Sequence, residues 1–152
     1  MPHHKDGLFE LAFPEIVNYV DATFNTIPDK AHRAIAGLSM GGMRTLMITA
    51  NYPDMFNYIG LYSAGVDFSH LNMEEVPAYA NLDAKLTKLA QGNPKLYWIA
   101  CGNEDWLLPA NKRLMERMDK DGLKYTFHES PRGHLWSNWR QYSLLFIPQL
   151  FK

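Results

Sequence analysis

The 152-residue sequence lacks the features that mark several protein classes. It has one cysteine, Cys101, which excludes an intrachain disulfide; because Cys101 lies in an apolar run, we expect a small buried side chain. No apolar run is long enough to span a membrane, and the N-terminus has no apolar signal-peptide segment. The 15 basic and 16 acidic residues nearly balance, so neither a nucleic acid nor a membrane surface is expected as a partner.

Metal-binding patterns are also missing from the sequence. Repeats, low-complexity segments and linkers are lacking too, and the length suits a single domain over residues 1–152. The sequence therefore predicts one domain and shows no pattern that suggests a metal site. Five of the six histidines show no spacing typical of metal ligands, namely His3, His4, His32, His70 and His128.

Helical and extended patterns of apolar residues alternate along the chain. Strand–helix alternation at this spacing predicts a three-layer α/β/α domain with a parallel sheet of about four strands. Residues 66–79 show no strong periodicity and are expected to form a loop that can carry a short helix. Helices are predicted over about 8–24, 41–51, 82–92, 111–121 and 138–151, and strands over about 32–38, 58–63, 95–101 and 123–129.

A serine between glycines lies where the first predicted strand meets the next helix. The stretch Gly37-Leu38-Ser39-Met40-Gly41 has the pattern G-x-S-x-G. In a strand–turn–helix of this kind the serine occupies the apex of a sharp turn, and its hydroxyl is presented as a nucleophile. An ordinary glycine-rich turn is the alternative, but the apolar strand before the pattern and the helical pattern after it favour the nucleophile turn.

Residues at the ends of later strands could supply an acid and a base. Functional groups in an open parallel sheet gather at the carboxyl ends of the strands. Asp105 follows the third predicted strand and His134 follows the fourth, so the order is Ser…Asp…His, as in the α/β-hydrolases. Asp105 could instead cap a turn, with Glu104 or Asp67 supplying the acid, and His134 could be a solvated loop residue.

The chemistry gives each of these residues a role. Serine is a poor nucleophile until a base takes its proton, so His134 is the expected general base, and Asp105 would hold its other ring nitrogen. The backbone N–H of Met40 would face the developing oxyanion, a contact worth roughly 3 kcal/mol of the barrier. Three tryptophans near the acid and the base could line an aromatic substrate pocket or pack in the core: Trp106, Trp136 and Trp139.

Four segments of the sequence are distinctive: G-L-S-M-G-G at 37–42, Y-P-D-M-F at 52–56, C-G-N-E-D-W at 101–106 and G-H-L-W at 133–136. With them the sequence resembles the esterase branch of the α/β-hydrolases, which includes the feruloyl esterases of carbohydrate esterase family 1. The resemblance implies that Ser39 is the nucleophile, Asp105 the acid and His134 the base. It also implies a cofactor-free enzyme, secreted or periplasmic in a bacterium, that hydrolyses hydroxycinnamoyl or acetyl esters on plant polysaccharide.

The chain carries only the later strands of the fold typical of this branch. The loop that donates a second oxyanion N–H belongs to the part that precedes the serine strand. The edge of that strand is therefore expected to be unpaired, which invites pairing with another chain in a homo-oligomer. Two alternatives to a serine esterase stay open: a catalytically incomplete binding module and an acyltransferase.

Overall fold

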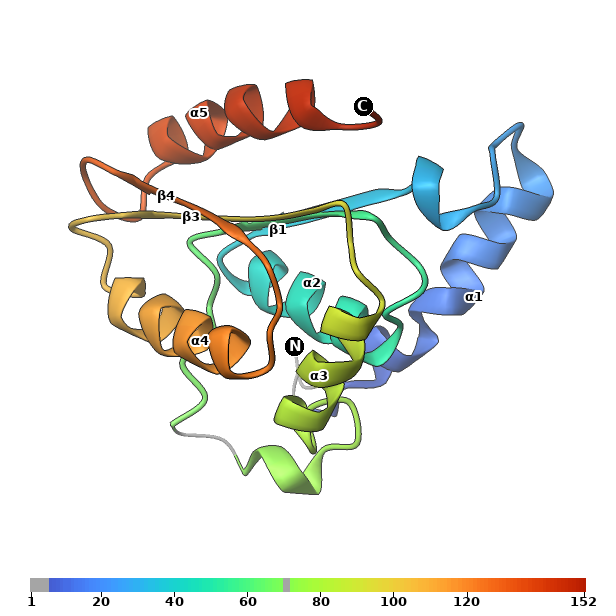
Figure 1. Cartoon of the computed structure of the whole chain (residues 1–152), viewed down its shortest axis with the longest axis horizontal. Helices are drawn as coiled ribbons and strands as arrows, with labels where there is room; N and C mark the ends of the chain where they lie inside the picture. Colours follow the sequence, from blue (N-terminus) through green and yellow to red (C-terminus); the bar gives the residue numbers. More distant parts are fainter. Residues whose placement is uncertain (1–5, 70–71) are drawn as a thin grey trace.

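Four parallel strands form the central sheet of the computed structural model, which describes residues 6–69 and 72–152 (Figure 1). Each strand pairs with the next one along the chain, in the order β1-β2-β3-β4. The carboxyl ends of all four strands therefore lie at one edge of the sheet, as the sequence predicts. The strands are β1 (Ala34–Leu38), β2 (Tyr58–Tyr62), β3 (Leu96–Gly102) and β4 (Thr126–Ser130).

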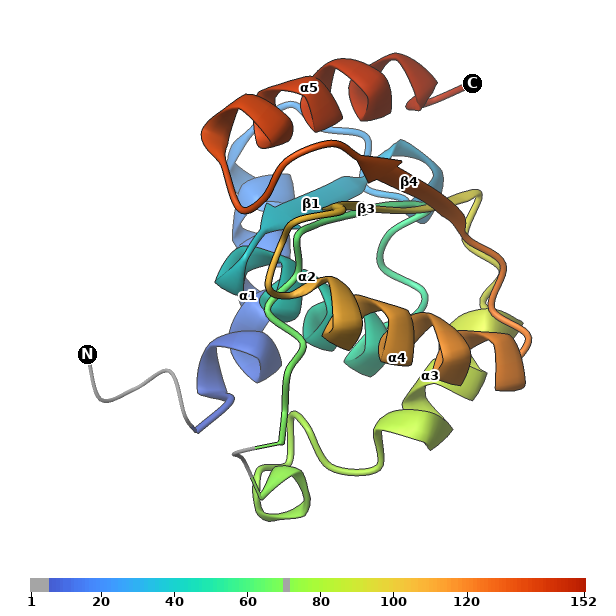
Figure 2. The same ribbon diagram turned by 90° about the vertical axis from the view of Figure 1, so that its left-hand side faces the viewer.

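Helices cover both faces of the sheet, which confirms the three-layer α/β/α fold. The last helix, α5, lies alone on one face, whereas α2, α3 and α4 lie on the other (Figure 1). The first helix, α1, packs beside α2 on that same side (Figure 2). The helices are α1 (Leu8–Thr23), α2 (Met40–Asn51), α3 (Leu82–Gln91), α4 (Leu108–Lys120) and α5 (Trp136–Phe146), with short 3-10 turns at Lys30–His32, Met73–Glu75 and Ile147–Gln149.

The core is divided into two clusters by the sheet. Successive side chains of a strand point to opposite faces, so Tyr97 and Ile99 of β3 pack toward α2, α3 and α4, while Trp98 and Ala100 pack toward α5. All four side chains are 3% exposed or less. A parallel strand buried on both faces is expected to be apolar along its whole length, which explains the continuous apolar run of β3.

Several predicted boundaries differ from the structure: the last helix spans Trp136–Phe146 and not 138–151, and the first strand begins at Ala34 and not at residue 32. Two further differences have identifiable reasons. The last strand begins at Thr126, not at residue 123, because Leu123 belongs to the end of α4. Gly122 adopts a positive φ of 73°, and the N–H of Leu123 reaches back to the carbonyl of Met118 at 3.0 Å, which is a helix C-terminal motif. The helix α4 begins at Leu108, three residues before the predicted start, because Pro109 suits a first helical turn.

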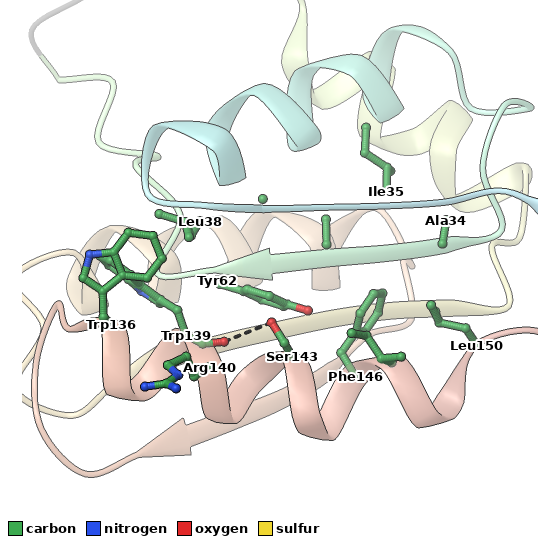
Figure 3. Close-up of a pocket in the computed structure, with 13 residues that line it drawn as sticks. Ala34, Ile35, Leu38, Tyr62, Trp136, Trp139, Arg140, Ser143, Phe146 and Leu150 are labelled. Atoms are coloured by element: carbon green, nitrogen blue, oxygen red, sulfur yellow. Dashed lines mark hydrogen bonds between the residues drawn. The ribbon is translucent and has the colours of Figure 1, made fainter. Parts of the chain in front are cut away.

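The strand β1 lies at the open edge of the sheet, with β2 as its one neighbour among the described residues. A groove of about 390 Å³ runs along this edge between β1 and α5 (Figure 3). Trp136 lies beside Leu38 at one end of the groove, and Leu150 lies near Ala34 at the other. The expected pairing of this edge with a second chain stays a prediction.

Candidate active site

Ser39 lies at a sharp turn between β1 and α2, where the sequence places the nucleophile. Its backbone has φ 52° and ψ −119°, a strained conformation for a residue other than glycine. The turn is tight enough to require Gly37, since a Cβ there would lie 2.1 Å from the carbonyl oxygen of Gly41. A Cβ on Gly42 would likewise lie 2.8 Å from the Cβ of Ala64. The glycines around Ser39 therefore let strand and helix make the turn.

Three polar side chains from three strand ends meet in one hydrogen-bonded row. The Nε2 atom of His134 lies 2.9 Å from the Oγ atom of Ser39. The Nδ1 atom of His134 lies 2.9 Å from Oδ2 of Asp105 and 3.2 Å from Oδ1. Because an ionised carboxylate can only accept, Nδ1 carries the proton and Nε2 is free to accept the serine hydroxyl proton. The row has the geometry of a nucleophile, a base and an orienting acid.

The other two acids considered from the sequence point elsewhere. Glu104 is exposed, and its backbone N–H donates to the carbonyl of Arg132. Asp67 accepts a hydrogen bond from the N–H of Ser69 and lies 3.8 Å from the Arg113 guanidinium. The structure therefore brings Asp105 to His134, and neither alternative acid.

Asp105 is held in place by more than its histidine. Its side chain is fully buried, and its Oδ1 atom accepts the backbone N–H of Leu107 at 2.9 Å. A buried carboxylate needs such partners, because an unpaired charge away from water is costly. This hydrogen bond fixes the rotation of the carboxylate, so that Oδ2 faces the imidazole of His134.

The buried cysteine near the site does not compete with the serine as a nucleophile. Cys101 is a free thiol with no exposed surface, as the sequence predicts. Burial, together with the negative charge of Asp105, raises the pKa of the Cys101 thiol to about 12. The reactive species of cysteine is the thiolate, which is therefore scarce at neutral pH.

Met40 follows Ser39 and is the first residue of α2. The first N–H groups of a helix have no partner within the helix, and they carry partial positive charge. The N–H of Gly65 donates to the carbonyl of Ser39 at 2.8 Å and so supports the turn from the β2 side. The position of Met40 suits the predicted oxyanion donor.

The three tryptophans near the site differ in exposure. Trp106 and Trp136 are 71% and 69% exposed, and the ring centroid of Trp106 lies 5.5 Å from that of His134. Trp139 is only 8% exposed and packs edge-on against His134, with ring centroids 4.8 Å apart. Trp106 and Trp136 are thus available to a ligand, whereas Trp139 supports the base from the core.

Two of the other histidines make contacts away from this site. His32 hydrogen-bonds the carboxylate of Asp29, and His128 stacks on Trp98. No group of three His, Cys, Asp or Glu side chains that could hold a metal ion occurs within residues 6–69 and 72–152. His3, His4 and His70 lie outside the described residues. In the same described part of the chain, every helix is too short or too polar to cross a membrane.

One buried polar residue near His134, Asn138, was not predicted from the sequence to belong to the site. Asn138 lies on the first turn of α5 with 7% exposure, and its side-chain amide contacts the loop that carries His134. The signal available in the sequence was a polar residue beside Trp139 and Tyr142 on the apolar side of a predicted helix.

The chain matches known proteins over most of its length. Residues 12–145 match the family model described as "Putative esterase". An endo-1,4-beta-xylanase/feruloyl esterase of Xylanibacter ruminicola is 53% identical over 51 residues, which are 34% of this chain and 7% of that protein. An acetyl esterase of Caldicellulosiruptor saccharolyticus is 27% identical, over 84% of this chain and 58% of that protein.

A solved structure shows the same fold. A ferulic acid esterase superimposes with a TM-score of 0.72 and 25% sequence identity. The superposition covers 92% of this chain but 59% of that one. The chain therefore spans less than two thirds of the length of these relatives.

Proposed function

This chain belongs to the esterase family, and we propose that it is a serine carboxylesterase whose nucleophile, base and acid are Ser39, His134 and Asp105. The observation that carries the proposal is the contact of 2.9 Å between His134 Nε2 and Ser39 Oγ, with Asp105 bonded to the opposite ring nitrogen. The strained turn at Ser39 adds support, because backbone strain of this kind is concentrated at functional sites.

The reaction follows from the positions of the three side chains. His134 Nε2 takes the hydroxyl proton as Ser39 Oγ bonds to the ester carbonyl carbon, and the carbonyl oxygen becomes an oxyanion facing the N–H of Met40. The carbon–oxygen bond to the alcohol then breaks, and His134 returns the proton to the departing alkoxide. Water repeats the sequence on the acyl-serine, releasing the acid and restoring Ser39. Asp105 stabilises the imidazolium form of His134 in both halves.

We propose hydroxycinnamoyl or acetyl esters of plant polysaccharide as substrates. The exposed indole of Trp106 lies beside His134, the exposed indole of Trp136 lies beside Leu38 at the end of the β1 groove (Figure 3), and an aromatic acyl group can stack on such surfaces. The names of two relatives, a feruloyl esterase joined to a xylanase and an acetyl esterase, support the same acyl groups and a polysaccharide carrier. A secreted or periplasmic location would bring the protein to that substrate.

A catalytically incomplete binding module is the second candidate. The chain spans 58% of the acetyl esterase and 59% of the ferulic acid esterase structure. What favours the binding module is that Met40 is the one oxyanion donor proposed among the described residues, whereas the hydrolase fold uses two. An acyltransferase would use the same serine chemistry with an alcohol in place of water.

Turnover of an aryl acetate and of a feruloyl ester by wild type and Ser39→Ala tests the proposal. Wild type is expected to hydrolyse at least one of them, and Ser39→Ala neither. Ser69→Ala, an exposed serine on the loop after β2, is the control and should match wild type. Wild-type turnover no faster than that of Ser39→Ala would refute the esterase proposal and favour the binding module. Transfer of the acyl group to an added alcohol, in preference to water, would indicate an acyltransferase.

A further inference from the structure

The loop from β4 to α5, which carries His134, has hydrogen bonds at four successive carbonyl groups. The carbonyl of Ser130 accepts the N–H of Asn103 at 2.7 Å, and the carbonyl of Arg132 accepts the N–H of Glu104 at 3.0 Å. These two bonds join the loop to the segment after β3 that carries the acid. The first and third of the four carbonyls, those of Ser130 and Arg132, are therefore held by backbone N–H groups that follow β3.

The two intervening carbonyls accept hydrogen bonds from a single side chain on α5. The Nδ2 atom of Asn138 lies 3.0 Å from the carbonyl oxygen of Pro131 and 3.1 Å from that of Gly133. It also lies 3.2 Å from the hydroxyl oxygen of Ser130. An amide nitrogen carries two N–H groups, so both N–H groups of Asn138 donate to the residues just before His134.

Asn138 is itself held from two sides. The hydroxyl of Ser130 hydrogen-bonds the hydroxyl of Tyr142 at 2.6 Å, one turn further along α5. On the other side, a Cβ on Gly102 would lie 2.1 Å from the carbonyl oxygen of Arg132 and 3.0 Å from Nδ2 of Asn138. The loop thus passes through a narrow space between the end of β3 and α5, with little room to shift while Asn138 is in place.

We propose that Asn138 is a positioning residue that holds the His134 loop so that Nε2 of His134 stays within hydrogen-bond distance of Ser39 Oγ. This inference rests on the proposed function and goes beyond the three reacting side chains. Without Asn138, the carbonyl of Gly133 would lose its donor, and the carbonyl of Pro131 would keep only the Ser130 hydroxyl at 3.2 Å, so the loop would move to reach water. A displacement of about 1 Å at reacting groups can lower a rate by about 100-fold.

A matched pair of alanine variants separates positioning from a loss of stability. Asn138→Ala removes a side-chain amide that serves two backbone carbonyls. Asn51→Ala does the same at the opposite end of α2 from Ser39, where Nδ2 donates to the carbonyls of Met47 and Ala78 at 2.7 and 2.8 Å. Both variants are expected to unfold at a lower temperature than wild type.

The readout is the rate at which a fluorophosphonate labels Ser39, because this reaction depends on His134 and not on a substrate pocket. Asn138→Ala is expected to label about 10- to 100-fold more slowly than wild type, with a matching fall in kcat and a KM within about twofold. Asn51→Ala should label within about twofold of wild type. Equal labelling rates for the two variants would overturn the proposal and leave Asn138 a purely structural residue.

A second variant covers the case in which Asn138→Ala does not fold. Asn138→Asp keeps the shape of the side chain, but an ionised carboxylate cannot donate to the two carbonyls. It is expected to show the same loss of labelling rate as the alanine variant. A wild-type rate for folded Asn138→Asp would refute the positioning role.

Proton NMR of the imidazole keeps the test separate from the proposed activity. If wild type labels nothing, the proposed function fails, yet the Nδ1 proton of His134 bonded to Asp105 can still be observed. Positioning by Asn138 predicts that this resonance is lost or exchange-broadened in the Asn138 variants and kept in Asn51→Ala. An unchanged resonance in Asn138→Ala or in Asn138→Asp would overturn the inference, whatever the enzyme does.

Discussion

Replacing Asp105 by asparagine should disable the site by reversing one hydrogen bond. The Oδ1 atom of Asp105 accepts the N–H of Leu107 at 2.9 Å, and Oδ2 faces Nδ1 of His134 at 2.9 Å. Asparagine has one oxygen and one nitrogen at these positions. The N–H of Leu107 requires the oxygen, so the amide nitrogen of the variant would be turned toward His134.

The consequence is a change of tautomer. An amide nitrogen donates, so Nδ1 of His134 would become the acceptor and the ring proton would move to Nε2. A protonated Nε2 cannot take the proton of Ser39. Substitutions of this kind in serine hydrolases lower kcat by about 10⁴-fold, which corresponds to roughly 5.5 kcal/mol of barrier. We expect the kcat of Asp105→Asn to be about 10³- to 10⁴-fold lower than that of wild type.

The assay is the hydrolysis of an aryl acetate, with kcat and KM determined for each variant. Glu104→Gln removes the neighbouring exposed charge and should retain wild-type kcat, because Asp105 and not Glu104 hydrogen-bonds His134. Thermal unfolding checks that Asp105→Asn is folded. A folded Asp105→Asn variant with kcat within about tenfold of wild type would refute the assignment of Asp105 and the argument from the Leu107 hydrogen bond.

Further predictions concern the turn, the α1 contact, the buried thiol and an exposed indole. Gly37→Ala places its Cβ 2.1 Å from a backbone oxygen, so we expect about 3 kcal/mol or more of lost stability by urea unfolding. Arg44→Ala leaves the Glu10 carboxylate of α1, 1% exposed, without its ion pair and should cost about 3–5 kcal/mol by the same measurement; a loss under about 1 kcal/mol would contradict the buried pair. The pKa of Cys101 is raised by burial from 9.0 to about 12, so its contribution to stability is complete below pH 9.0 and is lost as the pH rises toward 12; melting temperatures measured against pH should fall over that range less steeply in Cys101→Ala. Trp106→Ala should raise KM for a feruloyl ester several-fold while leaving KM for an aryl acetate within about twofold, since a stacked aromatic ring is worth about 1 kcal/mol; equal effects on both esters would contradict the stacking role.

The fold and the meeting of Ser39, Asp105 and His134 could be anticipated from the sequence. Parallel strands end at one edge of a sheet, so three polar residues at three strand ends were expected to lie together. The choice between Asp105 and its neighbour Glu104 could not be made from strand position. It depends on which side chain the turn after β3 directs inward, and the N–H of Leu107 shows that it is Asp105.

Other features depend on contacts between distant parts of the chain. The role of Asn138 arises because the His134 loop crosses α5 and leaves two carbonyls facing its first turn. The late start of β4 arises because Leu123 is bonded back to α4, although its apolar character suits a strand equally well. Neither periodicity nor spacing carries such information, since both features are set by tertiary packing.

The most direct test of the central claim is peptide mass mapping after exposure to a fluorophosphonate. If His134 activates Ser39 through the 2.9 Å contact, the adduct lies on the peptide that contains Ser39, and labelling is lost in His134→Ala. Labelling of wild type at any other residue, or labelling of Ser39 at the same rate with and without His134, would contradict the account.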